Sequence, residues 1–344
     1  MDSISSPAGI LFSFLASSFL TVVYALLIWW SDHYEREPLA LLAGSFLWGS
    51  LPAVVITLFI STLIGEPILI PDSALMSELW TSAALAPIIE ESAKGLALLF
   101  LLIGWRHEID GLLDGLVYGA MIGFGFGLTE NLFYFVSAYL AGGWGEWAVV
   151  VFTRGVVFGM NHAFFTAFTG AGVGLLQSHG GRRCWKLAPL AGWVLAVGAH
   201  AMHNLGASLA GKELAAVLIS LFSDGGGLAL LIVMIGLGQR QEQRWLREEL
   251  ASEIGVVLTA SDYSSLVTAG RRLAAAREAY RIGGWQQVRE VAAFHSAATE
   301  LAFVKQRVRN RGWTETGNQR ILQLRQRVAT KKSAQQRTAA KTVG

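Results

Sequence analysis

Four short strings in an otherwise apolar chain carry ionisable and amide side chains at helical spacing. They are EESAK (90–94), ENLFY (130–134), HAFFTAFTG (162–170) and HAMHN (200–204). A charge in the middle of a bilayer costs several kcal/mol, so such residues need a partner, a cavity or a function. Hydrolysis of a peptide bond needs an activated water, a group that takes its proton, donors for the oxyanion and an acid for the leaving amine. The strings contain all of these residue types, and hydrolysis is the chemistry that they favour.

The polar residues of these strings divide into candidate catalytic groups and supporting groups. The candidate catalytic residues are Glu90, Glu91, Glu130, His162 and His200. The supporting candidates, for positioning or for the oxyanion, are Lys94, Asn131, Tyr134, Thr166, His203 and Asn204. Residues at i and i+4 share a helix face, so each string is expected to present its polar groups together.

The spacing also assigns roles within this set. Glu90 or Glu91 is the candidate base that takes a proton from water. His200 and Asn204 lie one turn apart and are expected to offer N–H donors side by side to an oxyanion. His162 is expected to position the water or to protonate the leaving amine, and the structural alternative for Lys94 is that it only neutralises Glu90.

A divalent metal such as zinc is compatible with the same residues. Its candidate ligands are Glu90, Glu91, Glu130, His162 and His200, since ligands can come from different helices. The HExxH string of zincins is absent from the sequence, and HAMHN lacks the intervening glutamate. Metal-dependent hydrolysis and metal-free glutamate catalysis therefore both remain open. A GxSxG nucleophile and paired membrane aspartates are also absent.

Two other interpretations compete with hydrolysis. A proton-coupled membrane transporter can use the same buried Glu/His cluster to relay protons or to bind a substrate. Alternatively, the residues form hydrogen bonds between helices without catalysis, an interpretation that applies most readily to His203 and Thr166. Two adjacent glutamates in lipid are a costly way to join helices, which favours a functional site.

The elements that must position these residues are membrane helices. Of the 344 residues, 53% are hydrophobic and 15% are charged, against about 25% charged in soluble domains. Runs of about 20 apolar residues are long enough to cross a bilayer. The sequence predicts an all-α fold with about seven spans, over residues 9–30, 39–64, 78–105, 114–141, 147–177, 187–210 and 214–238. The single cysteine, Cys184, excludes an intrachain disulfide.

The arrangement of these spans follows from loop charge and from depth. Lys and Arg gather in SHGGRRCWK (178–186) and after the last span, which predicts an outside N-terminus and a cytoplasmic C-terminus in the cell membrane. Counting along alternating spans then brings the four polar strings to a similar depth. The glycines at 119, 123 and 127 form a small-xxx-small stripe that allows another helix to approach closely.

The sequence predicts three regions: a transmembrane domain at 1–238, a basic cytoplasmic helical tail at 239–330 and a disordered C-terminus at 331–344. Residues 239–344 carry 19 basic and 9 acidic side chains, a net charge of +10. We expect this charge to face the anionic inner leaflet of the bilayer. The aromatic residues are too few for a nucleic-acid stacking surface, so no specific nucleic acid is expected.

Taken in order, the four strings resemble the motifs of the PrsW-type intramembrane proteases, which share a superfamily with the CAAX prenyl-protein processing proteases. The resemblance covers roughly residues 10–238. It implies a helical membrane endopeptidase that cuts membrane-anchored proteins, in some members an anti-sigma factor, by glutamic or metallo-type chemistry. Glu90 and Glu91 match the paired glutamates of the first motif. The later motifs are matched by Glu130 with Asn131, by His162, and by His200 with Asn204. His203 departs from the pattern, since relatives usually carry an aromatic residue before that asparagine.

Overall fold

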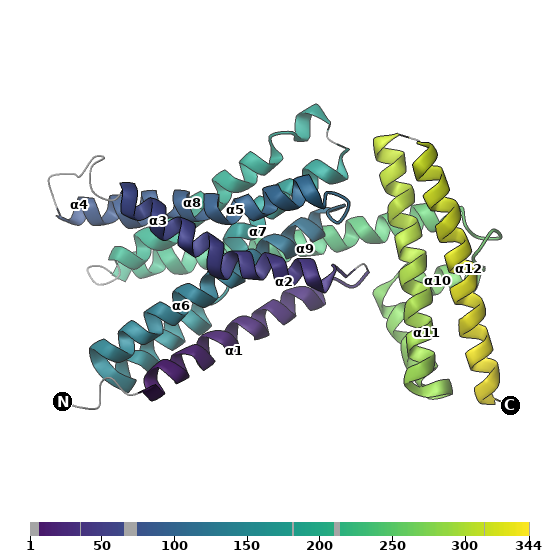
Figure 1. Cartoon of the computed structure of the whole chain (residues 1–344), viewed down its shortest axis with the longest axis horizontal. Helices are drawn as coiled ribbons and strands as arrows, with labels where there is room; N and C mark the ends of the chain where they lie inside the picture. The colour runs from purple at the N-terminus through teal and green to yellow at the C-terminus, as the bar shows by residue number, and fades with distance from the viewer. Residues whose placement is uncertain are drawn as a thin grey trace. The chain divides into compact units, whose positions relative to one another are not determined.

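The computed structural model of the chain is built of helices (Figure 1). It describes residues 7–34, 36–64, 74–180, 182–209, 214–312 and 314–343. Within these ranges no strand occurs, and the only β-type pairing is an isolated bridge between Ile254 and Leu258. The predicted all-α fold class is therefore confirmed.

The helices follow one another through short connections. Those that precede the candidate site are α1 Pro7–Ser31, α2 Leu39–Trp48, α3 Val54–Ile64 and α4 Ala74–Leu79. Those that carry it or pack beside it are α5 Ala86–Gly104, α6 Leu112–Val150, α7 Asn161–Ser178, α8 Ala188–Leu209 and α9 Leu214–Ala251. The remaining helices are α10 Ala260–Leu266, α11 Ala269–Arg311 and α12 Glu315–Val343.

Short π-helical and 3₁₀ segments interrupt or join several of the α-helices. Three π-helical segments occur in the described chain, η1 Gly49–Ala53, η2 Trp80–Leu85 and η3 Val151–Val157, and η4 Arg183–Trp185 is a 3₁₀ turn. Single-turn π segments are frequent at functional sites. Helix α6 also reverses at Gly143, whose φ of 68° lies in the left-handed region that glycine tolerates.

Among the described residues, four helical stretches are long and apolar enough to span a membrane, which supports a multi-pass membrane protein. They are Pro7–Ser31, Leu39–Ile64, Leu112–Ser178 and Val217–Ala251. The third stretch contains two predicted spans, 114–141 and 147–177, separated by the reversal at Gly143. The predicted spans 78–105 and 187–210 are helical but are not among the four, since they carry the site's polar residues. The number seven and the outside N-terminus stay predictions.

The chain forms two compact units. The first contains residues 1–31, 37–177 and 181–235, and the second contains residues 32–36, 178–180 and 236–344. The second unit has its own apolar core, built on Trp245, Leu266, Phe294 and Leu301. Residues 331–344 are expected to be disordered from their sequence, whereas α12 continues as a helix to Val343 in the structure. Its Ala, Gln, Lys and Arg residues are good helix formers, which explains the difference.

Helix α6 lies in the core of the first unit, and glycines allow its neighbours to touch its backbone. A Cβ atom on Gly119 would lie 2.6 Å from the carbonyl oxygen of Thr166, and one on Gly123 would lie 2.0 Å from that of His162. On another face, a Cβ atom on Gly125 would lie 1.9 Å from the carbonyl oxygen of Phe46. The predicted close approach along the glycine stripe is confirmed, and its partner is the helix that carries His162.

Candidate active site

Glu91 lies at the centre of a buried hydrogen-bonded cluster. Its side chain is fully buried, and Lys94 Nζ, three residues later on α5, donates to its Oε1 at 2.6 Å. Thr166 Oγ1 from α7 donates to Oε2 at 3.1 Å, and Nδ1 of His200 from α8 lies 3.0 Å from Oε1. Both oxygens are thus engaged by groups from three helices. Glu91 is placed to hold Lys94 and His200 in position.

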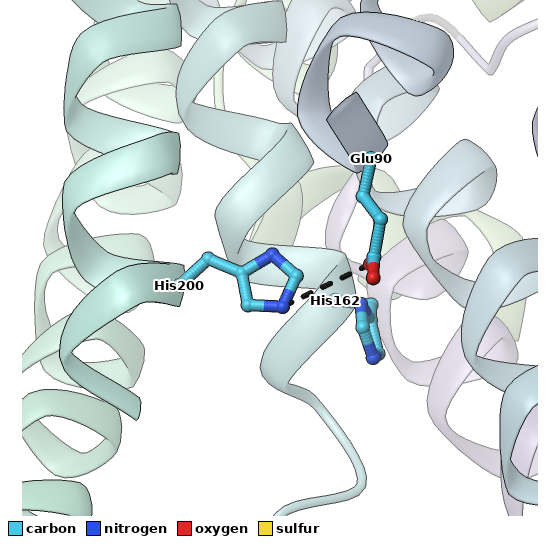
Figure 2. A group of neighbouring side chains, drawn as sticks. All are labelled: Glu90, His162 and His200. Atoms are coloured by element: carbon cyan, nitrogen blue, oxygen red, sulfur yellow. Dashed lines mark ion pairs between the residues drawn. The ribbon is translucent and has the colours of Figure 1, made fainter. Parts of the chain in front are cut away.

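Glu90 differs from its neighbour in one decisive respect. Its Oε2 atom is buried yet receives no hydrogen bond from any residue that the structure describes. The nearest charged partners are Lys94 Nζ at 3.6 Å and His200 Nε2 at 3.8 Å. Figure 2 shows this carboxylate directed towards His200 and His162. Glu90 therefore keeps an oxygen available for a water, a metal or a substrate.

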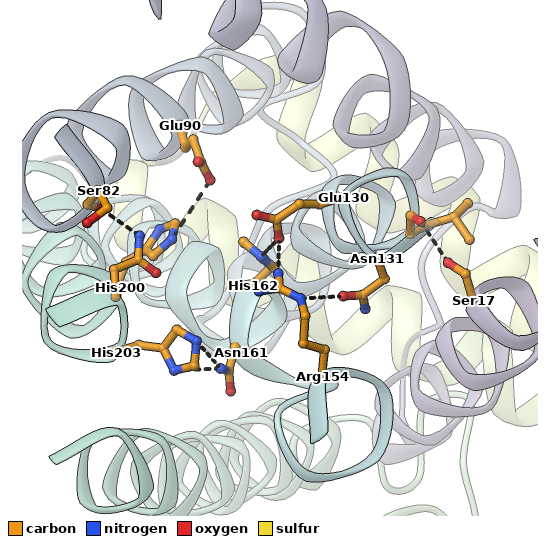
Figure 3. A network of polar contacts seen from close by, with 12 residues as sticks. Ser17, Ser82, Glu90, Glu130, Asn131, Arg154, Asn161, His162, His200 and His203 are labelled. Carbon is orange, nitrogen blue, oxygen red and sulfur yellow. Dashed lines mark hydrogen bonds and ion pairs between the residues drawn. The ribbon is translucent and has the colours of Figure 1, made fainter. Parts of the chain in front are cut away.

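A second cluster surrounds Glu130 on α6 (Figure 3). Its Oε2 atom lies 2.6 Å from His162 Nε2 and accepts a hydrogen bond from Arg154 Nη2 at 2.7 Å. Arg154 Nε also donates to Asn131 Oδ1 at 3.4 Å, and its guanidinium lies 3.6 Å from the ring centroid of Tyr134. Three predicted residues of the second string, together with an arginine from η3, thus form one ion-paired group.

His162 joins the two clusters. Its Nε2 atom contacts Glu130 at 2.6 Å, and its Nδ1 atom lies 3.1 Å from Lys94 Nζ. A continuous polar path therefore runs from Arg154 through Glu130, His162 and Lys94 to Glu91. The structure brings all five candidate catalytic residues together. The depth count from the sequence predicts this convergence for Glu90, Glu130, His162 and His200.

Asn204 and His203 lie apart from this path. The Asn204 amide donates to the carbonyl oxygen of Ser82 in η2 at 2.8 Å. That turn has π geometry, and the residue five positions after Ser82 is Pro87, which has no N–H to offer. His203 contacts Asp224 of α9 at 2.8 Å. The expected pairing of His200 and Asn204 around an oxyanion is thus not what the structure shows.

Arg154 and Asp224 are site residues that the sequence analysis did not assign. Each is a charged residue inside a predicted apolar span, 147–177 and 214–238 respectively. The position of each charge inside an apolar span already indicates a role, because an ionised side chain there needs a partner. Helical spacing indicates which residues share a face but does not indicate which neighbouring helix that face meets.

A polar pocket opens beside His162. The space between its atoms totals about 390 Å³ when the adjoining open solvent is included, so the closed part is much smaller. Its polar lining includes Asn131, Arg154, Asn161, His162 and His203, from α6, η3, α7 and α8. Because His162 belongs to both the pocket and the polar path, a group bound in the pocket would lie next to the candidate catalytic residues.

The residues also suit a metal ion. Glu90, His162 and His200 each offer one ligand atom, and these atoms lie within 4.8 Å of one another. One carboxylate and two imidazoles are the donor set of many catalytic zinc sites, which keep a further position open. The orphaned buried Oε2 of Glu90 fits such a ligand. Glu91 and Glu130 fit less well, since hydrogen bonds and ion pairs already engage them. A metal on His162 would have to replace its contact with Lys94 or with Glu130.

Comparison with known proteins assigns most of the first unit to one family. The model of the PrsW family of intramembrane metalloproteases matches residues 37–237, a range that contains every site residue described above. A protease PrsW from Clostridioides difficile (strain 630) is 33% identical over 124 residues, which are 35% of this chain and 50% of that protein. A protease PrsW from Geobacillus kaustophilus (strain HTA426) is 34% identical over 106 residues, 31% of this chain and 44% of that protein.

The chain spans about half the length of these curated relatives. No solved structure matches it. The family match covers more than half of the chain and includes α5 to α8, the helices that carry the two clusters. This chain therefore belongs to the PrsW family of intramembrane metalloproteases.

Proposed function

We propose that this protein is an intramembrane endopeptidase that hydrolyses peptide bonds of membrane-anchored proteins in the cell membrane. The observation that carries the proposal is the buried Oε2 of Glu90, which accepts no hydrogen bond within the described chain and faces His200 and His162. An anti-sigma factor or a similar membrane-tethered regulator is the proposed class of substrate. The name and family of the relatives support the protease assignment, and the substrate class is part of the proposal.

In the proposed mechanism Glu90 takes a proton from the attacking water. Glu91 holds His200 beside it, and Glu130 with Lys94 fixes the ring of His162. Arg154 adds positive charge at the pocket, where negative charge develops on the substrate carbonyl oxygen. In a metal-dependent form of the reaction, a divalent metal held by Glu90, His162 and His200 would supply a Lewis acid for the substrate carbonyl and the attacking water. The role of Glu90 as the base belongs to the metal-free form.

The test is cleavage of a tagged, membrane-anchored reporter protein co-expressed with the enzyme. A proteomic comparison of membrane-anchored proteins with and without the active enzyme supplies the reporter sequence. Glu90→Gln and His200→Ala are expected to insert and fold but to leave the reporter uncut. Ser92→Ala is the matched control on α5, since its exposed hydroxyl only bonds the Ile88 carbonyl one turn earlier. Undiminished cleavage by both site variants would refute the assignment.

The same reporter separates the catalytic types and the transporter alternative. Cleavage that survives exhaustive chelation, by protein with no metal detectable by mass spectrometry, would assign the reaction to the carboxylate alone. Loss of cleavage on chelation, restored by zinc, would assign it to a metal. A transporter that uses the same Glu/His cluster would leave the reporter intact even with the unmodified enzyme.

A further inference from the structure

The ring nitrogens of His162 and His200 face the charged groups of the two clusters. His162 meets Lys94 through Nδ1 and Glu130 through Nε2. His200 meets Glu91 through Nδ1 and faces Glu90 through Nε2. Peptide hydrolysis still needs a group that protonates the leaving amine. Both imidazoles lie beside Glu90, the residue that takes the water proton in the proposed mechanism. A separate group is therefore needed to protonate the leaving amine.

His203 is the other histidine in the described lining of the pocket. It lies on α8 one turn after His200, and Figure 3 shows it on the pocket side together with Asn161 and Arg154. The Asn161 amide nitrogen lies 3.1 Å from its Nδ1 and 3.4 Å from its Nε2. An amide nitrogen only donates, so if Nδ1 carries a hydrogen, Asn161 can bond only Nε2, and this contact is long at 3.4 Å. A substrate nitrogen would have to displace this weak contact in order to reach Nε2.

Asp224 supplies the orientation of this ring. Its Oδ2 atom lies 2.8 Å from His203 Nδ1, and an ionised carboxylate only accepts, so Nδ1 carries the hydrogen. The second oxygen, Oδ1, is buried and has no hydrogen-bond partner among the described residues. Ser220 Oγ, one turn earlier on α9, donates to the His203 carbonyl at 3.0 Å. A buried carboxylate behind an imidazole fixes its tautomer and stabilises its protonated form, as in hydrolases that use an Asp–His pair.

We propose that His203, oriented by Asp224, is the proton donor to the leaving amine. This inference rests on the proposed endopeptidase function. The attacking water forms the new C–O bond and gives a proton to Glu90. The C–N bond then breaks, its electron pair stays on nitrogen, and that nitrogen takes the Nε2 proton of protonated His203. Glu90 then releases its proton to solvent and His203 takes one up from solvent, so that one water is consumed per bond cut.

The surroundings of His203 suit this role. The charged or titratable groups that face it are Asp224 from α9 and, across the pocket, Arg154 from η3 and His162 from α7. The Phe158 ring packs edge-on at 5.2 Å between centroids and limits its rotation. His203 is the catalytic residue in this proposal and Asp224 is the positioning residue.

The test compares two bonds in one sequence. The probes are a synthetic membrane-spanning peptide that carries the cleavage site found with the reporter, and its analogue with an ester in place of the scissile amide. The alcohol oxygen of an ester departs without prior protonation far more readily than the amine nitrogen of an amide does. His203→Gln is expected to lower kcat for the amide by about 10²-fold to 10³-fold, the contribution typical of general acids, and to spare the ester. Asp224→Asn is also expected to lower kcat for the amide and to spare the ester, but by a smaller factor.

Ser220→Ala is the matched control, since it removes a hydrogen bond to the His203 backbone and leaves the imidazole in place. It should change amide and ester cleavage by the same factor. The double variant His203→Gln/Asp224→Asn should be no slower than His203→Gln, because Asp224 acts through the ring. Equal losses on amide and ester in a folded His203→Gln protein would overturn the proton-donor role while the protease assignment stands. Failure of the unmodified enzyme to cut either probe would overturn the protease assignment itself.

Discussion

At the scale of single residues, the two adjacent glutamates of α5 have different surroundings. Glu91 is saturated by Lys94, Thr166 and His200, whereas Glu90 keeps an unbonded oxygen. Sequence alone leaves the two equivalent, because both are carboxylates at almost the same depth. The difference arises from the neighbours on α7 and α8, which only the packed structure defines.

This difference predicts separate effects on stability and on activity. Glu91→Gln leaves the fully buried Lys94 without its closest counter-charge, and removal of one partner of a buried ion pair costs about 3–5 kcal/mol. Glu90→Gln should cost much less, since its pair with Lys94 is longer, at 3.6 Å. Thermal unfolding in detergent, read alongside reporter cleavage, measures both effects.

The double variant Glu91→Gln/Lys94→Met provides the control. It removes both charges of that pair and should recover part of the lost stability without recovering cleavage. The remaining loss is the cost of leaving Glu90 without Lys94, its partner at 3.6 Å. If Glu91→Gln unfolds at the temperature of the unmodified protein, the cluster around Glu91 does not stabilise Lys94 as described.

The sequence predicts the residue types of the site well and their contacts only in part. Charged residues in apolar spans at matching depth indicate that Glu90, Glu130, His162 and His200 converge. Asn204 satisfies the same pattern, but it donates to the Ser82 carbonyl instead. The π turn η2 that presents that carbonyl depends on local backbone geometry, which hydrophobic periodicity does not encode.

At the scale of elements, the distance between α6 and α7 determines where His162 lies. A methyl group on Gly123 would meet the His162 carbonyl oxygen at 2.0 Å and Cα of Ala163 at 2.7 Å, so the α7 backbone must move. Gly123→Ala should therefore cost about 1–3 kcal/mol through overpacking. A displacement of His162 near 1 Å should also lower kcat by about 10²-fold.

Gly95→Ala on α5 is the matched control for this substitution. Its Cβ would meet no neighbouring atom within 4 Å in the described chain, the backbone of its own helix aside. The change should leave cleavage intact and stabilise the helix by about 0.5–1 kcal/mol. Equal activity of Gly123→Ala and Gly95→Ala would contradict the role assigned to the contact between α6 and α7.

At the scale of the whole molecule, the division into units follows packing as well as chain order. Tyr34 belongs to the core of the second unit, where its hydroxyl accepts from the Ala269 N–H at 3.2 Å. The Ser178 carbonyl accepts from the Asn310 amide at 2.8 Å within the same unit. The change in composition near residue 239 indicates where a basic segment begins. It does not indicate that two short upstream segments, 32–36 and 178–180, pack with it.

The second unit should be sensitive to acid because of His295 on α11. This side chain is 8% exposed, and burial, with a further contribution from Arg272, lowers its pKa to about 4 from the ordinary value of 6.5. The folded state therefore favours the neutral ring, and the unfolded chain binds more protons between these two values. Stability is complete above pH 6.5 and is lost as the pH falls towards 4, by about 2 kcal/mol at pH 5.

Hydrogen exchange of the full-length protein in lipid nanodiscs, followed by mass spectrometry, measures this loss within α11. Protection of the helix should decrease between pH 7 and pH 5 once the intrinsic exchange rate is corrected for pH. His295→Gln cannot titrate and should abolish the decrease, whatever its effect on stability at pH 7. Asp262 should not contribute to the change between pH 7 and pH 5. The ion pair with Lys332 lowers the pKa of this carboxyl from its ordinary value of 3.8, so it stays ionised over that range. An unchanged pH dependence in His295→Gln would show that another group controls the acid response of this unit.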